Sequence, residues 1–263
     1  MNDNKTSWGK EAGWYDSLLA MDSTYQKDVI LPNMIRLMDI KTSDHILDVA
    51  CGQGFFSKAF AERGAEVMGT DISRELIKLA QQKMGPREKY MILPADKLTG
   101  NIVPKTYDKA CIILALQNIE NYQEVVSEIA RALKSGGKFY LILNHPAFRI
   151  PKLTSWGWDE DNKVQFRRVD GYLSESKAEI DMHPGHTNRQ SPGRTGGNKN
   201  SITYSFHRPL QLYFKALAKS DFVITRLEEW NSQKKSLPGP RQKAEDQSRK
   251  EIPMFMMIEC SKI

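Results

Sequence analysis

The sequence contains no apolar run that approaches the roughly 20 residues needed for a membrane-spanning helix. Its first residues, MNDNKTSWGKEAGW, are polar and lack the apolar core of a secretory signal peptide. These two absences exclude the usual marks of a membrane or secreted protein. We therefore expect a cytoplasmic protein with no membrane partner.

Cysteine is scarce: the 263 residues include only Cys51, Cys111 and Cys260. They form no C-x-x-C pair, so a zinc site built on them is not expected. Cys111 and Cys260 lie within apolar runs, which argues against disulfides and favours a reducing compartment. His183 and His186 have a possible ligand spacing, but their Pro-Gly interior does not favour the fixed geometry of a metal site. We expect no metal.

A strong excess of one charge is also missing. The formal net charge is +6, which permits an anionic partner but does not demand one. Hydrophobic residues make up 40% and charged residues 27%, as in soluble globular proteins. The length fits one domain with an insertion.

Between residues 45 and 144, short apolar runs alternate with amphipathic segments. We expect strands at 45–50, 66–70, 89–93, 108–116 and 138–143. We expect helices at 55–63, 73–84 and 122–133, and the pattern resumes with a helix at 208–219 and strands at 222–227 and 253–260. This alternation is typical of a doubly wound α/β sheet with helices on both faces.

Two segments lie outside this alternation. Residues 1–44 have helical spacing after Trp8, and Pro32 is expected to kink this segment or to open a new helix. Residues 145–206 are aromatic and polar, and 184–200 has the Gly, Asn, Ser and Arg content of a mobile loop. We therefore predict an N-terminal helical segment at 1–44, a core at 45–144 and 207–263, and an inserted cap at 145–206.

A glycine-rich turn, Asp48-Val49-Ala50-Cys51-Gly52-Gln53-Gly54, lies at the first strand–helix junction. Glycine lets a backbone turn sharply and approach a ligand closely. Such a turn alone is shared by many nucleotide-binding folds. The next two strands, however, are followed by further acids, Asp71 and Asp96, so that three neighbouring strand ends each carry a carboxylate.

The segments LDVACGQG, GTDIS, PADKL and ALKSGGKFYLIL, in this order, resemble the successive motifs of class I S-adenosylmethionine-dependent methyltransferases. The resemblance covers residues 45–144, with 208–261 similar to the end of the family's domain. It implies a seven-stranded Rossmann-like sheet whose last strand is antiparallel and inserted between the fifth and sixth. A dinucleotide-binding enzyme is the second reading, but GQGFFS lacks the third glycine or alanine of that fingerprint.

The resemblance also implies a role for individual residues. Asp48 and the glycine turn would face the methionine part of S-adenosyl-L-methionine, Asp71 the ribose, and Asp96 the adenine amino group. Leu116 and Gln117 would lie beside the transferable methyl group. The full set of predicted cofactor-binding residues is Tyr15, Asp48, Ala50, Gly52, Gly54, Asp71, Ile72, Asp96, Leu116 and Gln117. Core packing is an equal alternative for Tyr15.

The acceptor site is expected in the insertion, which leaves the fifth strand on the ligand side of the sheet. His145 and His207 are candidates for a general base, although a structural hydrogen bond would explain either one. The predicted substrate-binding residues are Arg149, Trp156, Trp158, Arg168 and Tyr172. Their aromatic and cationic side chains suit an anionic or planar substrate, or a small satellite core.

These features predict an S-adenosylmethionine-dependent methyltransferase acting on a small molecule. An RNA or protein methyltransferase is an alternative, because basic residues gather at 234–235 and 241–250, but acids dilute them. A non-catalytic S-adenosylmethionine-binding protein is a third possibility.

Overall fold

The computed structural model describes residues 13, 23–181 and 202–263. Three features singled out in the sequence therefore lie outside the described residues: Tyr15, the segment 184–200, and the pair His183 and His186. None of the helices within the described ranges is long and apolar enough to cross a membrane.

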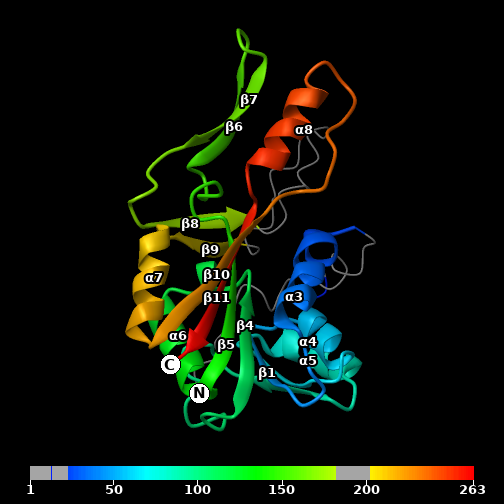
Figure 1. The fold of residues 1–263 in the computed structure, drawn as a ribbon, viewed down its shortest axis with the longest axis vertical. Coiled ribbons are helices and arrows are strands. Elements are labelled where there is room, and N and C mark those ends of the chain that lie inside the picture. Colours follow the sequence, from blue (N-terminus) through cyan, green and yellow to red (C-terminus); the bar gives the residue numbers. More distant parts are fainter. Residues whose placement is uncertain (1–12, 14–22, 182–201) are drawn as a thin grey trace, which may run out of the picture.

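A seven-stranded sheet forms the centre of the fold (Figure 1). Its strands stand in the order β10-β11-β5-β4-β1-β2-β3. Strand β11 is antiparallel to both of its neighbours, whereas β1 to β5 are parallel. The strands span His45–Val49 (β1), Glu66–Asp71 (β2), Glu88–Ile92 (β3), Tyr107–Ile113 (β4), Leu133–Asn144 (β5), Phe222–Trp230 (β10) and Phe255–Lys262 (β11). The predicted fold is confirmed, including the position of the antiparallel strand.

Helices cover both faces of this sheet (Figure 1). One face carries the π-helix η1 (Gln26–Ile30), α3 (Leu31–Met38), α4 (Phe55–Ala61) and α5 (Arg74–Lys83). The other carries α6 (Tyr122–Ala132) and α7 (Leu210–Lys219). Two local predictions hold: Pro32 stands in the first turn of α3, where the π-helix η1 gives way to an α-helix, and Ser73 caps α5 by accepting the Leu76 N–H.

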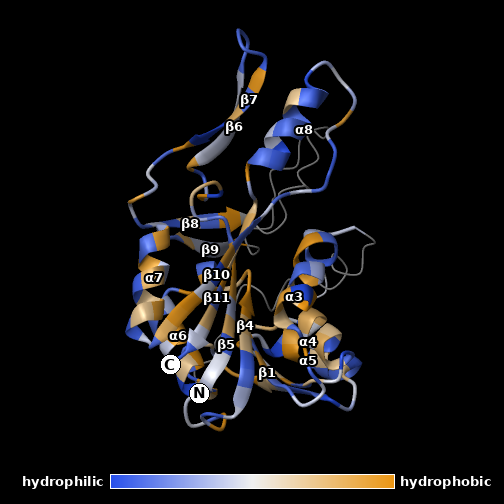
Figure 2. Ribbon diagram, in the orientation of Figure 1, coloured by the Kyte–Doolittle hydropathy of each residue, from blue (hydrophilic) through white to orange (hydrophobic). Residues whose placement is uncertain are grey.

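The core is split by the sheet into two apolar layers, as alternation along β1 illustrates. Ile46 packs with residues of α3 and α4, whereas Leu47 and Val49 pack with residues of α6 and α7. Successive side chains of a strand point to opposite faces, so a continuous apolar strand supplies both layers. Figure 2 shows the same concentration of hydrophobic residues in the sheet and its flanking helices.

The inserted segment forms two separate hairpins. Strands β6 (Thr154–Asp159) and β7 (Val164–Val169) make the first, and β8 (Ser176–Asp181) and β9 (Ile202–His207) the second. The β6–β7 hairpin packs beside helix α8 (Gln242–Glu251), and both extend away from the sheet (Figure 1). The β8–β9 hairpin instead lies across the end of the sheet. It runs through His207, one residue beyond the predicted end of the insertion.

Candidate cofactor site

Unusual backbone conformations mark the ends of two central strands. After β1, the turn passes through positive φ at Ala50 (56°), Gly52 (60°) and Gly54 (81°). After β4, Leu114 adopts a φ of 54°. The strand therefore ends at Ile113 and does not continue to residue 116, where the sequence had predicted its end. Positive φ is unfavourable for alanine and leucine, and such strain tends to gather at functional sites.

A cavity of about 440 Å³ opens between these strand ends and the β8–β9 hairpin. We call it the strand-end cavity. Its floor includes five of the ten predicted cofactor-binding residues, and its roof is formed by the β8–β9 hairpin. Its lining includes Ala50, Gly52, Asp71, Ile72, Asp96, Leu114, Glu120, Asn121, Lys177, Thr203, Tyr204 and Phe206. The structure thus brings together half of the predicted cofactor residues.

Asp71 holds the centre of this floor at the end of β2. One carboxylate oxygen accepts the Gly52 N–H at 3.0 Å, and the other accepts the Ser73 N–H at 2.8 Å. Burial raises the pKa of Asp71, and these N–H donors act in the opposite direction. A carboxylate has about four acceptor sites, so Asp71 can accept further hydrogen bonds from a ligand.

Asp96 lies at the next strand end, after β3, and is half-buried. It accepts a hydrogen bond from the Asn121 side chain at 3.1 Å. Both residues line the strand-end cavity. The cavity floor therefore offers two carboxylates from neighbouring strands, which suits a ligand rich in hydroxyl and amino donors.

Asp48 does not line the cavity. It is 2% exposed, accepts the Ser57 hydroxyl at 2.6 Å and lies 3.5 Å from the Cys111 sulfur. Burial raises its pKa to about 6, although the bonds from Ser57 and Cys111 oppose this rise. In this structure Asp48 supports the turn from beneath, and direct contact with the cofactor stays a prediction.

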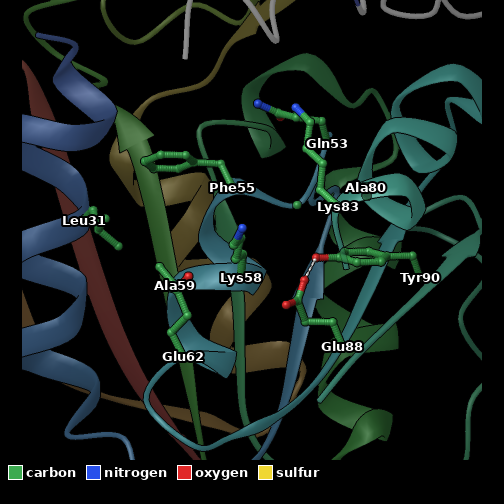
Figure 3. A pocket seen from close by; sticks show the side chains of 11 residues that line it. Leu31, Gln53, Phe55, Lys58, Ala59, Glu62, Ala80, Lys83, Glu88 and Tyr90 are labelled. Carbon is green, nitrogen blue, oxygen red and sulfur yellow. Dashed lines mark hydrogen bonds between the residues drawn. The ribbon is translucent and has the colours of Figure 1, made fainter. Parts of the chain in front are cut away.

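Gly54 lines a different cavity, the helix groove, of about 280 Å³ between α4 and α5. Figure 3 shows Tyr90 and Glu88 on its floor, joined by a hydrogen bond of 2.5 Å. A β-carbon on Gly54 would stand 2.4 Å from the Tyr90 hydroxyl oxygen. The structure therefore requires glycine here for packing and for backbone conformation.

Leu116 and Gln117 form the short 3-10 helix η2 (Leu116–Asn118) beside the cavity and are buried. The Gln117 side chain donates to the Leu114 carbonyl at 2.7 Å. Arg208, only 3% exposed, holds the same loop by donating to the carbonyls of Ile119 and Glu120 at 2.8 and 2.9 Å. Sequence reasoning did not assign this positioning role to Arg208.

The two histidines predicted as candidates for a general base are buried, and both make hydrogen bonds within the protein. His145 Nδ1 accepts the N–H groups of Ala147 and Phe148, so Nε2 carries the proton and donates to Glu229 at 2.7 Å. His207 Nε2 donates to the Tyr172 carbonyl at 2.7 Å. Neither lines the strand-end cavity. A base role for either would require it to leave these contacts.

The predicted substrate residues do not line the cavity either. Trp156 and Trp158 belong to the β6–β7 hairpin, where the guanidinium carbons of Arg167 and Arg241 lie 5.1 and 4.5 Å from their ring centroids. On the same hairpin, Arg168 pairs with Asp170 at 2.8 Å.

The other two predicted substrate residues stand near the strand ends. Arg149 is exposed, and its backbone N–H donates to the His145 carbonyl. The Tyr172 hydroxyl accepts the Leu210 N–H at 3.1 Å. The cavity roof instead comes from Lys177, Thr203, Tyr204 and Phe206, which the alternation in ITYSFH could have indicated.

Comparison with known proteins supports a methyltransferase domain. Residues 47–141 match the model of a methyltransferase domain family. The ubiquinone biosynthesis O-methyltransferase of Idiomarina loihiensis is 34% identical over 103 residues, which cover 38% of this chain and 42% of that protein. A demethylmenaquinone methyltransferase of Bacillus cereus is 30% identical over 132 residues, covering 47% and 54% respectively. The chain thus spans about half the length of these relatives.

Solved structures share the fold over nearly the whole chain. An S-adenosylmethionine-dependent methyltransferase from Mesorhizobium loti superimposes with a TM-score of 0.67 at 22% identity, covering 90% of this chain and 99% of that one. The [4+2]-cyclase SpnF superimposes with a TM-score of 0.61 at 12% identity, covering 97% and 93%. The fold alone therefore does not fix the reaction.

The family match, the strand order and the ordered motifs agree with one another. The resemblance to class I S-adenosylmethionine-dependent methyltransferases is thereby confirmed for the domain that these residues form. S-adenosylmethionine is the cofactor that this domain implies. No cluster of metal-ligating side chains occurs among the residues that the structure describes.

Proposed function

We propose that the protein transfers a methyl group from S-adenosylmethionine to a small-molecule acceptor in the strand-end cavity. One observation carries the proposal: Asp71, Asp96 and the glycine turn meet on the floor of a single cavity that the β8–β9 hairpin covers. The names of the curated relatives, which refer to ubiquinone and demethylmenaquinone, favour small acceptors as well.

The residues on the floor would hold the cofactor by its adenosine part. Asp71 would accept the ribose hydroxyls with its remaining lone pairs, Ile72 would pack on the adenine, and Asp96 would accept its amino group. Bound there, S-adenosylmethionine would supply an electrophilic methyl group to an acceptor atom, with the carbon–sulfur bond breaking and its electron pair staying on sulfur. The protein's task is then to position the acceptor, at about 3–3.5 Å, and to exclude water.

The acceptor would enter beneath the β8–β9 hairpin. We infer that His207 shapes the base of this hairpin and that His145 fixes the chain after β5, since their ring nitrogens bond to neighbouring protein groups. Catalysis would rest mainly on positioning, and an acceptor that must lose a proton could release it to bulk solvent outside the closed cavity. The inserted segment 145–206 would then act as a cap through its second hairpin.

A macromolecular acceptor is less well supported. Three of the basic residues near the C-terminus, Lys243, Arg249 and Lys250, lie on α8, which also carries Glu245, Asp246 and Glu251. Helix α8 packs beside the β6–β7 hairpin and extends away from the central sheet (Figure 1). The three free cysteines are all buried, which is compatible with the cytoplasmic location that we propose.

Release of S-adenosylhomocysteine in the presence of a metabolite extract tests the proposal. We expect release that survives treatment of the extract with RNase and protease. Loss of release after either treatment would instead indicate a macromolecular acceptor. Cofactor binding without release on any extract would indicate a protein that binds S-adenosylmethionine without turnover.

A further inference from the structure

The roof of the strand-end cavity is an aromatic face. Along β9, Tyr204 and Phe206 alternate with the buried Thr203, Ser205 and His207. Both rings line the cavity, and Tyr204 remains 45% exposed. A large aromatic side chain that lies over a cavity and is left half uncovered marks a surface for a ligand with an apolar face.

A lysine stands on the same face of the hairpin. Lys177 is paired in register with Phe206, so the two side chains point to the same side of the hairpin. The Lys177 ammonium lies 4.4 Å from the Tyr204 ring centroid and 5.2 Å from that of Phe206. Cation–π contacts with the two rings thus fix the position of the Lys177 ammonium at the cavity surface.

The carboxylate nearest to this ammonium holds it only weakly. Lys177 and Glu120 are 3.9 Å apart, and the Glu120 side chain is 71% exposed. An exposed pair at that distance contributes little. The ammonium has three hydrogen-bond donors, so it can also donate to a second anionic group inside the cavity.

Charge divides the cavity into two ends. Asp71 and Asp96 lie on the floor, whereas Lys177, with the exposed Glu120 beside it, is the one basic side chain among the described residues that line the cavity. An anionic substituent would be repelled at the floor and would compete with Glu120 for the ammonium at the roof. The floor and the roof therefore suit different ligands, a donor-rich cofactor below and an acidic molecule above.

We propose that the methyl acceptor is a planar aromatic molecule that carries a carboxylate or similar anionic group. Its ring packs against Tyr204 and Phe206, and its anionic group pairs with the Lys177 ammonium. This inference rests on the proposed methyltransferase function and adds the chemical class of the acceptor.

Binding of matched acids and amides tests this inference. The full-length protein is saturated with S-adenosylhomocysteine and titrated calorimetrically with benzoate, the hydroxybenzoates and the naphthoates, and then with the corresponding carboxamides. We expect at least one acid to bind at least about tenfold more tightly than its amide, the loss expected when a charge-assisted hydrogen bond is removed.

Three variants assign this preference to the hairpin. Lys177→Met should abolish the preference for the acid, and Tyr204→Leu should weaken acid and amide alike. Lys215→Met, an exposed lysine on α7, should match the wild type. Affinity for S-adenosylhomocysteine itself should stay unchanged in all three.

The possible failures are distinguishable. If the wild type does not bind S-adenosylhomocysteine, the proposed function fails before the acceptor is tested. If it binds but no acid exceeds its amide, or Lys177→Met keeps the preference, the acceptor class is wrong. If Lys177→Met or Tyr204→Leu weakens S-adenosylhomocysteine instead, the roof belongs to the cofactor site and the inference is overturned.

Discussion

Replacing Asp48 by asparagine should change how the stability of the protein depends on pH. The Asp48 carboxyl is 2% exposed and lies in the first strand beneath the glycine turn. Burial raises its pKa from 3.8 to about 6. The folded protein therefore binds a proton between about pH 4 and pH 6 that the unfolded chain has already released.

The sign and size of the effect follow from that shift. A raised carboxyl pKa in the folded state means that stability falls as pH rises through this window and that the full cost is present above about pH 6. At about 1.4 kcal/mol per pKa unit, the cost approaches about 3 kcal/mol. Asparagine carries no charge, and its carbonyl can still accept the Ser57 hydroxyl, which lies 2.6 Å from Asp48.

Urea unfolding at pH 4.5 and pH 7.5 measures the difference. The free energy of unfolding of Asp48→Asn, relative to wild type, should increase by about 2 kcal/mol between these pH values. Asp71, whose pKa is also raised, is present in both proteins, and its negative charge contributes to the raised pKa of Asp48, so the difference reports Asp48 together with its coupling to Asp71. Asp161→Asn, at an exposed turn, should show no such change. A relative stability independent of pH would refute the reasoning.

Three further substitutions test single contacts. Gly54→Ala should lower the melting temperature, because its β-carbon would stand 2.4 Å from the Tyr90 hydroxyl oxygen at a φ of 81°; an unchanged melting temperature would contradict this packing. Arg208→Met should lower the free energy of unfolding in urea by about 3 kcal/mol, because three loop carbonyls lose a charged donor. An unchanged free energy of unfolding would mean that these carbonyls find other donors, and would contradict the positioning role of Arg208. His145→Ala should reduce stability by breaking its bonds to Glu229 and the backbone, and a stable variant with lost turnover would point to a catalytic base.

The sheet could be predicted from the sequence because its signals are local. Apolar runs such as HILDVA fix the strands, and the ordered motifs fix which strand end carries Asp71 and which carries Asp96. Strand order then follows from the resemblance. Boundaries were less accurate: β4 ends before Leu114, whose positive φ has no mark in the sequence.

The acceptor side could not be predicted as well, because it depends on long-range packing. The aromatic composition around Trp156 and Trp158 suggested a pocket, yet β7 of their hairpin packs beside α8, which begins more than 70 residues further along the chain. The roof depends on pairing of 176–181 with 202–207 across a long separation. The alternating pattern in ITYSFH could have indicated that Tyr204 and Phe206 share one face, but not that this face covers a cavity.

Calorimetric titration of S-adenosylmethionine into the wild type and Asp71→Ala tests the central claim most directly. The account predicts that the wild type binds and that Asp71→Ala binds more than about tenfold more weakly, since a charged hydrogen-bond acceptor on the cavity floor is worth roughly 1.5–3 kcal/mol. Asp161→Ala serves as the exposed control and should match the wild type. Equal affinity in Asp71→Ala, or no binding by the wild type, would contradict the assignment of the strand-end cavity to the cofactor.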